Sequence, residues 1–451
     1  MDFSGKKMLV LGAGISGIAV AGILQDKGAT VTLSDTKPAE NIKHDLTGLK
    51  EKGVALALGR QDEALLTDTD YVIVSPGVSI YSPLVVKAQE SGIAVMSEIE
   101  VAYRLCSAPI VAITGTNGKT TTTTLTGEIL KAAGREVVVG GNIGLALSQE
   151  VKDISASGIV VAEISSFQLE GVLTFRPHVA AILNLTPDHI DRHRSLATYQ
   201  DMKERIFANQ TFEDYLILNY DDPALREMAG RAPSQVVFFS RKVELETGVF
   251  VKDDALTLKW QGETLTICPV ASIKIKGGHN VENALAACAA AFFAGAKPAA
   301  MAEVLAAFPG VEHRIEPVAT VAGVTYYNDS KATNPESSIK ALEAFPANII
   351  LIAGGKDKNT DLSEFMQLIK ERVDHLILLG EAKERFNEAA VRQGVKNIHC
   401  VDDFSSGVKL AHQLARPPQV VVLSPACASY DMFNNYEERG KAFKELVHRL
   451  K

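Results

Sequence analysis

Short apolar runs alternate with stretches of mixed polarity from the start of the chain. Uninterrupted runs of this length are typical of strands that are buried on both faces of a sheet. Polar or glycine-rich turns separate them from stretches in which apolar positions recur at helical spacing. Strands are therefore expected at residues 8–11, 31–33 and 71–74, and a helix at residues 18–27. Strands that alternate with helices predict a parallel sheet, and we expect a first domain over residues 1–97.

The same alternation continues along the rest of the chain and predicts a second domain (residues 98–310) and a third (residues 311–451). Strands of the second domain are expected at residues 110–113, 137–139, 159–162, 179–183 and 215–218, followed by an antiparallel meander at 249–251 and 256–260 and a helix at 280–295. Those of the third are expected at residues 324–327, 349–353, 375–379 and 420–423. The predicted fold class is α/β with three domains, each a largely parallel sheet with flanking helices. The first and third should be Rossmann-like and the second P-loop-like.

Composition narrows the classes of partner. The chain has 451 residues, of which 46% are hydrophobic and 22% charged, and its net charge is −8. No basic stripe is present, so nucleic acid is not an expected partner. Glycines interrupt the first apolar run, and no run is long enough to span a bilayer, so we expect neither a signal peptide nor membrane insertion. Five scattered cysteines favour a reducing cytosol.

The strongest local motif is the run Thr-Gly-Thr-Asn-Gly-Lys-Thr-Thr at residues 114–121, between an expected strand and an expected helix. Glycines let backbone N–H groups turn toward phosphate oxygens, and the positive end of the helix dipole adds to the attraction. Lys119 can reach terminal phosphates, and the hydroxyl of Thr120 can bind Mg²⁺. The motif departs from the strict phosphate-loop pattern at Ile113, where a glycine is usual.

A second glycine-rich turn, Gly-Ala-Gly-Ile-Ser-Gly at residues 12–17, follows the first strand, and Asp35 ends the next one. This is the dinucleotide fingerprint in its expected context, and alone it would favour NAD. Any other diphosphate could use the same turn.

Polar residues that could bind a metal or an anion follow other strands. Glu163 closes the strand at residues 159–162, and segment 184–193 holds both His189 and His193 after another strand. The spacing does not decide between the two histidines as a ligand. In the third domain, polar segments follow three strands at residues 328–335, 354–358 and 424–429. Their lysines would suit an anionic substrate, since open α/β sheets build sites at the carboxyl ends of strands.

Taken together, these motifs resemble the Mur ligase family, and the resemblance covers the whole chain in order. The family's phosphate loop tolerates the departure at Ile113. The matching stretches are residues 114–121, 163–169, 188–191, 278–283, 313–314, 329–334 and 424–433.

The resemblance implies ATP and Mg²⁺ as cofactors and assigns roles by position. The catalytic residues would be Lys119, Glu163, His189 and Lys203. ATP would contact Gly115, Thr116, Asn117, Gly118, Lys119, Thr120, Thr121, Asn280, Asn283, Arg314 and Asp329. The metal would be held by Thr120, Glu163, His189 and Lys203. Lys203, on a helix expected at residues 198–209, matches a lysine that the family modifies with CO₂ to a carbamate.

The resemblance also reassigns the first glycine turn from NAD to a uridine nucleotide. That substrate would contact Ile15, Ser16, Asp35, Thr36, Lys37, Ser75, Gly77, Asn142 and Ser165. The incoming amino acid would contact Lys331, Thr333, Lys358, Ser429 and Tyr436. Whether Lys356 or Lys358 meets its side-chain carboxylate stays open.

The implied activity is ATP-dependent ligation through an acyl phosphate, giving ADP and phosphate, in cytoplasmic peptidoglycan precursor synthesis. The compact first domain, the segment 424–429 and the third-domain lysines favour D-glutamate, added to UDP-N-acetylmuramoyl-L-alanine. No Asn-Pro-Arg element, typical of the sister ligase for meso-diaminopimelate, occurs in the sequence. We expect the chain to act as a monomer.

Four other interpretations remain. A sister ligase would add another amino acid. Folylpolyglutamate synthetase shares the phosphate loop but has no nucleotide-binding domain at its N-terminus. An NAD-dependent dehydrogenase would leave the Lys119 loop unexplained. A non-catalytic nucleotide sensor would bind ATP without turning it over.

Overall fold

The computed structural model has three sheets in two compact units. The described residues are 3–42, 44–357 and 359–450. The first unit comprises Met1–Ile273 and Val281–Ala307, and the second comprises Lys274–Asn280 and Phe308–Lys451. The predicted α/β class with three largely parallel sheets is confirmed. Boundaries near residues 97 and 310 stay predictions.

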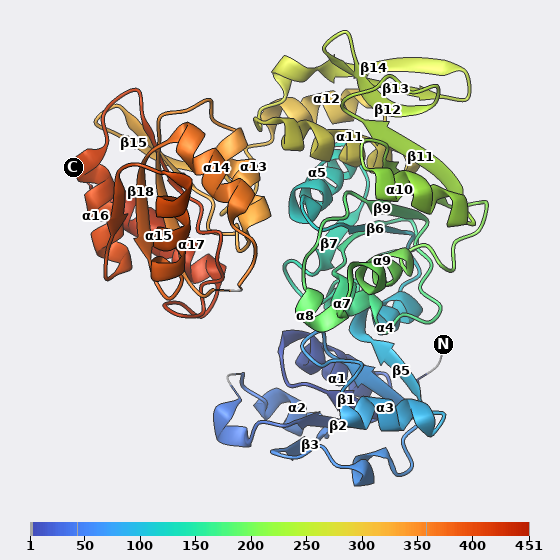
Figure 1. The fold of residues 1–451 in the computed structure, drawn as a ribbon. Coiled ribbons are helices and arrows are strands. Elements are labelled where there is room, and N and C mark those ends of the chain that lie inside the picture. The colour runs from blue at the N-terminus through green and yellow to red at the C-terminus, as the bar shows by residue number, and fades with distance from the viewer. Residues whose placement is uncertain (1–2, 43, 358, 451) are drawn as a thin grey trace. The chain divides into compact units, whose positions relative to one another are not determined.

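The first sheet has five parallel strands in the order β3-β2-β1-β4-β5 (Figure 1). Its strands are β1 Lys7–Leu11, β2 Thr30–Asp35, β3 Ala55–Leu58, β4 Tyr71–Val74 and β5 Ala94–Ser97. Its helices are α1 Ile15–Asp26, α2 Thr47–Glu51 and α3 Pro83–Glu90, with short turns η1 Ala39–Asn41 and η2 Glu63–Leu66. The order reverses at β1, between β2 and β4, so the glycine turn after β1 lies at a topological switch point, where such sheets bind ligands.

The central sheet has nine strands in the order β14-β13-β12-β11-β10-β9-β6-β8-β7. They are β6 Ile110–Thr114, β7 Val137–Gly141, β8 Ile159–Glu163, β9 Val179–Ile182, β10 Tyr215–Asn219, β11 Gln235–Ser240, β12 Gly248–Lys252, β13 Ala255–Trp260 and β14 Glu263–Pro269. The helices are α4 Glu98–Leu105, α5 Lys119–Ala132, α6 Leu147–Glu150, α7 Ser166–Leu169, α8 Ile190–His193, α9 Leu196–Glu204, α10 Pro223–Met228, α11 Gly278–Phe293 and α12 Pro298–Ala307, with turns η3 Ala229–Arg231 and η4 Val270–Ser272. β12, β13 and β14 pair antiparallel, which confirms the expected meander and adds a strand to it.

The third sheet has the order β15-β16-β20-β17-β18-β19 and is parallel except where β15 pairs with β16. Its strands are β15 Glu316–Val321, β16 Val324–Asn328, β17 Ile349–Gly354, β18 Val373–Leu379, β19 Ile398–Cys400 and β20 Val420–Leu423. Its helices are α13 Pro335–Glu343, α14 Ser363–Arg372, α15 Lys383–Gln393, α16 Phe404–Leu414 and α17 Tyr436–His448. Apolar side chains on both faces of this sheet form separate clusters beneath the helices.

Three neighbouring central strands position the site. Every residue of β6, β8 and β9 is buried, which explains why each reads as a continuous apolar run. β6 pairs in parallel with β8 on one side and β9 on the other. Polar residues at the three carboxyl ends, Thr114, Glu163 and Asn184, therefore come to one edge.

The three predicted helices all have different bounds in the structure: α11 is shifted by two residues, and α1 and α9 differ by more. α1 begins at Ile15, three residues earlier than expected, because the N–H of Ile18 already bonds the carbonyl of Gly14 at 2.9 Å. α9 ends at Glu204, so the expectation of a helix to residue 209 is wrong. There the chain continues in turns whose N–H groups bond three residues back, with Ile206 and Phe207 buried. Among the described residues, no helix combines the length and apolarity that crossing a membrane requires.

Candidate functional site

The turn between β6 and α5 has a conformation that requires glycine at two positions. Gly115 has φ +152° and Gly118 has φ +83°, values that side chains disfavour. A Cβ on Gly118 would lie 2.2 Å from Oδ1 of Asn283, and a Cβ on Gly115 would lie 3.0 Å from Cβ of Leu183. The structure thus brings Asn283, expected near ATP, against the phosphate loop.

Asn184 braces this loop from the end of β9. Its Oδ1 accepts the backbone N–H groups of Thr116 at 3.0 Å and Asn117 at 2.8 Å, and its Nδ2 donates to the carbonyl of Asn117. The Thr116 hydroxyl donates to the carbonyl of Thr186 at 3.1 Å. These bonds fix the loop and direct the first turn of α5, which contains Thr120 and Thr121, toward the site. The first N–H groups of a helix have no acceptor within it, so they suit phosphate.

Lys119 and Lys203 converge on one atom, although they lie 84 positions apart in the sequence. Each donates Nζ–H to the carbonyl oxygen of Gly115 at 2.9 Å. Lys203 is fully buried, and its Nζ lies 4.4 Å from the ring centre of Tyr199. Burial first, and then the charge of Lys119, hold the pKa of Lys203 well below its ordinary 10.5, while Asp188 acts in the opposite direction.

Glu163 brings a buried carboxylate to the same edge. Its Oε1 accepts Nδ2 of Asn142 at 2.7 Å, and its Oε2 is buried without a hydrogen-bond partner among the described residues. The buried hydroxyls of Thr114 and Thr121 likewise have no partner there. A buried carboxylate oxygen that no donor satisfies is costly. The unsatisfied Oε2 of Glu163 is therefore the oxygen that best fits a bound cation.

The structure distinguishes the two histidines that the sequence left equivalent. His193 is fully buried, and its Nε2 lies 2.9 Å from the hydroxyl of Ser166. The side chain of His189 is 40% exposed, 3.6 Å from Asp188, with its ring 4.8 Å from that of Phe167. His189 is therefore the histidine accessible to a ligand. Ser165 has a structural bond as well, because it forms the capping box of α7 with Gln168.

The backbone of the first glycine turn is held by close packing of its glycines and by hydrogen bonds with two side chains, Ser75 and Asp35. A Cβ on Gly17 would lie 1.9 Å from the carbonyl oxygen of Gly12, so only glycine fits there. The hydroxyl of Ser75 donates to that same carbonyl at 3.0 Å. Asp35 accepts the N–H of Ala13 at 2.8 Å and that of Lys37 at 2.9 Å. Several residues expected to contact the uridine nucleotide are exposed around this turn: Ile15, Thr36, Lys37 and Gly77, with Ser16 half-buried.

Arg192 links this region to the central sheet. Its guanidinium donates to the carbonyls of Pro76 at 2.7 Å and Val78 at 3.0 Å, and it pairs with buried Glu170. Arg192 also lies over the ring of Phe167, 4.2 Å from its centre. The strand-end loop that contains Ser75 and Gly77 is thereby fastened beside the segment that carries His189.

In the second compact unit, Asp329 is buried at the end of β16. Its Oδ2 accepts the hydroxyl of Ser424 at 2.7 Å, and its Oδ1 accepts the N–H of Ile315 at 3.2 Å. Burial raises the pKa of Asp329 to about 7, although Arg314 and Ser424 lower it. Nε of Arg314 is buried without a partner in the described part of the chain. Arg314 and Asp329 are therefore the candidates in this unit for contacting the polar groups of a nucleotide.

The expected amino-acid contacts are only partly gathered. Nζ of Lys331 lies 5.3 Å from the ring centre of Tyr436. Ser429 is buried and Thr333 half-buried. Lys358 lies outside the described residues. In this unit, Asn280 donates to the carbonyl of Lys276 at 2.7 Å.

Arg439 is a residue that the motifs did not identify. It is 1% exposed, and its guanidinium donates to the hydroxyl and carbonyl of Ser330 and to the carbonyls of Cys427 and Ala428. It thereby fixes two expected substrate loops. Asn184 lies in the polar segment 184–193, but nothing in its spacing predicts a role. Arginines in amphipathic helices and asparagines at strand ends are common in sequences. The pattern alone therefore could not single out Arg439 or Asn184.

Models of known families match most of the chain. The Mur ligase MurD-like N-terminal domain matches residues 6–97, the Mur ligase middle domain residues 113–291, and the Mur ligase glutamate ligase domain residues 313–427. These matches follow one another in the same order as the three sheets.

Curated relatives and solved structures are similar over nearly the full length. UDP-N-acetylmuramoylalanine–D-glutamate ligase of Pelotomaculum thermopropionicum is 47% identical over 450 residues, covering 100% of this chain and 99% of the relative. The protein of the same name from Geotalea uraniireducens is 46% identical over 452 residues, with 100% and 99% coverage. UDP-N-acetylmuramate–alanine ligase from Thermotoga maritima has a TM-score of 0.61 at 21% identity, covering 98% of this chain and 99% of that one. A pseudomurein peptide ligase type C from Methanothermus fervidus has a TM-score of 0.61 at 19% identity, with 99% and 100% coverage.

Proposed function

The chain belongs to the Mur ligase family, and we propose that it joins D-glutamate to UDP-N-acetylmuramoyl-L-alanine with hydrolysis of ATP to ADP and phosphate. Relatives with 47% and 46% identity over their whole lengths bear the name of that reaction. The compartment is the cytosol, where its five free cysteines stay reduced. The active form is a monomer.

The observation that supports the chemistry most strongly is the junction of the phosphate loop with Lys119, Lys203 and Glu163. The first turn of α5 supplies backbone donors, and Lys119 supplies a positive charge, at the place where terminal phosphates would lie. A dehydrogenase or a simple nucleotide sensor has no need for a second, buried lysine and an unsatisfied carboxylate at this point. Ligation needs both phosphoryl transfer and a cation.

The substrate carboxylate is a poor acyl donor, so it must first be activated. One of its oxygens attacks the γ-phosphorus of ATP, ADP leaves, and an acyl phosphate forms. Lys119 stabilises the charge that develops on the transferred phosphoryl group. Mg²⁺, when bound by Thr120, Glu163 and His189, would neutralise phosphate charge and align the reacting oxygens.

The amine of D-glutamate then attacks the acyl carbon. The tetrahedral adduct collapses, phosphate leaves with the oxygen that came from the carboxylate, and an amide remains. Lys331, Thr333 and Ser429 are proposed to bind the two carboxylates of the incoming amino acid, with Lys358 as a further candidate. Arg314 and Asp329 are proposed to meet the nucleotide.

Lys203 is proposed to react with CO₂ and to form a carbamate. Only a neutral amine reacts with CO₂, and burial beside Lys119 favours the neutral form of Lys203. Two ammonium groups on the single carbonyl of Gly115 would repel each other, which favours the same outcome. The carbamate would replace one positive charge by a carboxylate-like metal ligand.

A substrate panel tests the proposed function. Purified enzyme is given ATP, Mg²⁺ and each UDP-linked muramyl precursor with each candidate amino acid, and phosphate release is measured together with the mass of the product. Release should require UDP-N-acetylmuramoyl-L-alanine and D-glutamate together. Turnover with L-alanine, L-lysine or meso-diaminopimelate in place of D-glutamate would overturn the assignment, and so would reduction of NAD without ATP.

A further inference from the structure

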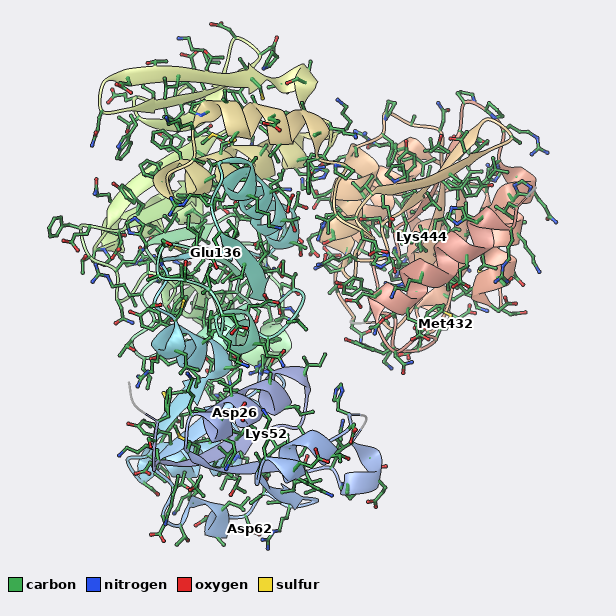
Figure 2. All side chains as sticks on the ribbon, turned by 180° about the vertical axis from the view of Figure 1, so that it is seen from behind. Asp26, Lys52, Asp62, Glu136, Met432 and Lys444 are labelled. Carbon is green, nitrogen blue, oxygen red and sulfur yellow. The ribbon has the colours of Figure 1, made fainter. Side chains whose placement is uncertain are left out.

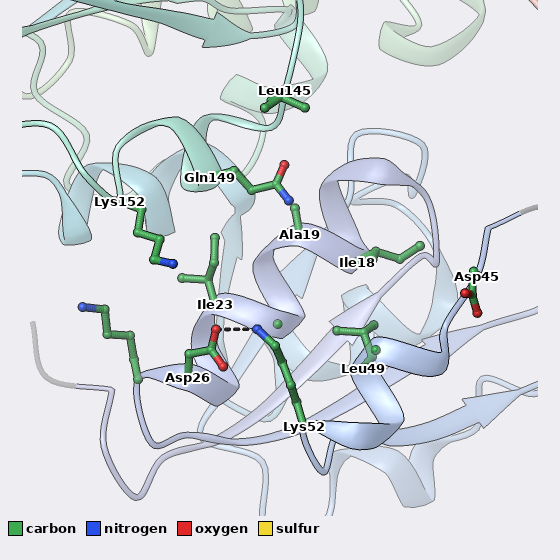
Figure 3. Close-up of a pocket in the computed structure, with 13 residues that line it drawn as sticks. Ile18, Ala19, Ile23, Asp26, Asp45, Leu49, Lys52, Leu145, Gln149 and Lys152 are labelled. Atoms are coloured by element: carbon green, nitrogen blue, oxygen red, sulfur yellow. Dashed lines mark hydrogen bonds and ion pairs between the residues drawn. The ribbon is translucent and has the colours of Figure 1, made fainter.

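A pocket of about 520 Å³ lies in the first compact unit, apart from every residue assigned above to ATP, metal or substrate. One wall is the face of α1 that presents Ile18, Ala19 and Ile23 (Figure 3). Leu49 of α2 continues this wall, and Leu145, before α6, closes the pocket from the central sheet's side. The walls formed by these side chains are apolar. The lining residues come both from the domain that precedes residue 98 and from the one that follows it.

The charges around the pocket are uneven. Three lysines and two aspartates line it: Lys27, Lys52, Lys152, Asp26 and Asp45. Lys52 is neutralised by Asp26 at 2.5 Å, a pair on the molecular surface (Figures 2 and 3). Lys27 and Lys152 have no ion-pair partner within residues 3–42, 44–357 and 359–450. Asp45 lies at the opposite end from Lys152 and bonds Thr47.

This arrangement selects a class of ligand. In a chain whose net charge is −8, two unpaired ammonium groups beside an apolar wall form a local positive site. An apolar molecule of the right size would bury the exposed side chain of Leu145, which is 56% exposed. An anionic group at one end of that molecule would pair with Lys27 and Lys152.

The wall of the pocket is connected to the candidate site by three residues of chain. The carbonyl of Leu145 accepts the N–H of Gly141 at 3.3 Å. Between them, Asn142 bonds Glu163 twice, through its N–H to the carbonyl at 2.8 Å and through Nδ2 to Oε1 at 2.7 Å. A ligand that packs against Leu145 and shifts it therefore acts on the residue that orients the carboxylate of Glu163.

We propose that this pocket binds a small amphipathic anion, with its charged group at Lys27 and Lys152 and its apolar body between α1 and Leu145, and that the occupant slows ligation by shifting the turn that holds Glu163. The binding site stands independently of the reaction. The effect on ligation rests on the proposed function.

The test uses 8-anilinonaphthalene-1-sulfonate, an aryl sulfonate whose fluorescence rises on apolar contact, with the full-length enzyme. We expect one molecule bound per chain. Lys152→Glu and Leu145→Asp should each raise Kd by about tenfold or more, the first by repulsion and the second by loss of apolar contact. Lys242→Glu, an exposed lysine of the central domain that does not line the pocket, is the matched control and should leave Kd within about twofold.

Equal Kd values in the pocket variants and the control would overturn the site, and thermal melting shows that each variant is folded. Phosphate release is then titrated with the same probe. Inhibition should follow the binding curve in the unmodified enzyme and shift with Kd in Lys152→Glu. Binding at the pocket without inhibition would overturn the coupling alone. An enzyme that binds the probe as expected but makes no D-glutamate product would overturn the proposed function and leave the pocket intact.

Discussion

The two glycine-rich turns of the first compact unit have the same outline and different chemistry. Both follow a buried parallel strand and open a helix, and both contain glycines that a side chain would force out of place. In the turn after β1, the hydroxyl of Ser75 donates to the carbonyl of Gly12, and the carboxylate of Asp35 accepts the N–H of Ala13. In the turn after β6, two lysine Nζ atoms meet the carbonyl of Gly115, and a carboxylate oxygen of Glu163 is left without a donor in the described chain.

The difference shows that a glycine motif specifies the shape of a phosphate-sized recess, while the residues brought to it from elsewhere specify its chemistry. The first turn can hold a diphosphate by shape and backbone N–H groups alone. The second turn carries in addition the lysine charges that the proposed phosphoryl transfer needs. We propose on this basis that the first turn serves substrate binding and the second serves catalysis.

The largest expected effect comes from removing Lys203, the lysine of α9 that contacts the turn after β6. Lys203→Ala should lower ligation by on the order of a thousandfold, because it deletes both a loop contact and the proposed carbamate. Added formate or acetate should restore part of the rate by filling the vacated position. The rate is followed as phosphate release with and without carboxylate. Near-normal activity without rescue would contradict the role given to this residue.

Lys119→Ala should cost on the order of a hundredfold in kcat, because a partner of the transition-state charge is lost. The counterpart at the first turn is Lys37→Ala, which removes an exposed cation. It should raise KM for the uridine substrate and leave kcat nearly unchanged. Steady-state kinetics of the two variants measure both. If Lys37→Ala lowered kcat as strongly as Lys119→Ala, the division between binding and catalysis would be wrong.

Glycine-to-alanine substitutions compare the backbone conformations of the two turns directly. Gly118→Ala would bring a Cβ to 2.2 Å from Asn283 at a φ of +83°, so the loop must shift, and ATP turnover should fall about tenfold. Gly14→Ala is the matched change in the first turn, where a Cβ meets nothing within 4 Å. It should be tolerated, with activity within about twofold. Similar losses in both variants would show that the crowding at Gly118 is not specific.

The smallest effect concerns a buried acid at another strand end. The pKa of Asp329 is raised on folding from 3.8 to about 7, so the folded protein binds this proton more tightly than the unfolded chain. Stability should therefore fall as pH rises between about 4 and 7 and be steady above that range. In Asp329→Asn this decline is absent, and Tm relative to the natural chain should rise by roughly 2–4 °C from pH 5 to pH 8. Melting at both pH values checks the sign, and a pH-independent difference would contradict it.

Apolar runs predicted the fold closely because most strands are buried on both faces. The strand expected at residues 71–74 has those bounds in the structure, and β6, β8 and β16 differ by one residue. Edge strands such as β3 and β19 were not predicted, since half-exposed strands carry a weaker apolar signal. The end of α9 was misplaced because tertiary packing of Ile206 and Phe207 tightened the chain into turns.

Candidate residues could be located from the sequence where they follow directly on a strand, as at Glu163 and in the phosphate loop, and their roles stay predictions. Such residues could not be located where they act at long range. Nothing in the spacing marks the convergence of Lys203 on Gly115, and only burial distinguishes His189 from His193. Bracing residues such as Asn184 and Arg439 satisfy backbone groups of distant loops, so their roles appear only in three dimensions.

The central claim is that the substrate carboxylate attacks ATP directly and leaves its oxygen in the phosphate. It is tested most directly with UDP-N-acetylmuramoyl-L-alanine labelled with ¹⁸O in the carboxylate, followed by mass spectrometry of the products after one turnover with D-glutamate. We predict ADP and inorganic phosphate that carries one ¹⁸O atom, with the other retained in the new amide. Unlabelled phosphate, or AMP and pyrophosphate as products, would contradict the acyl-phosphate mechanism.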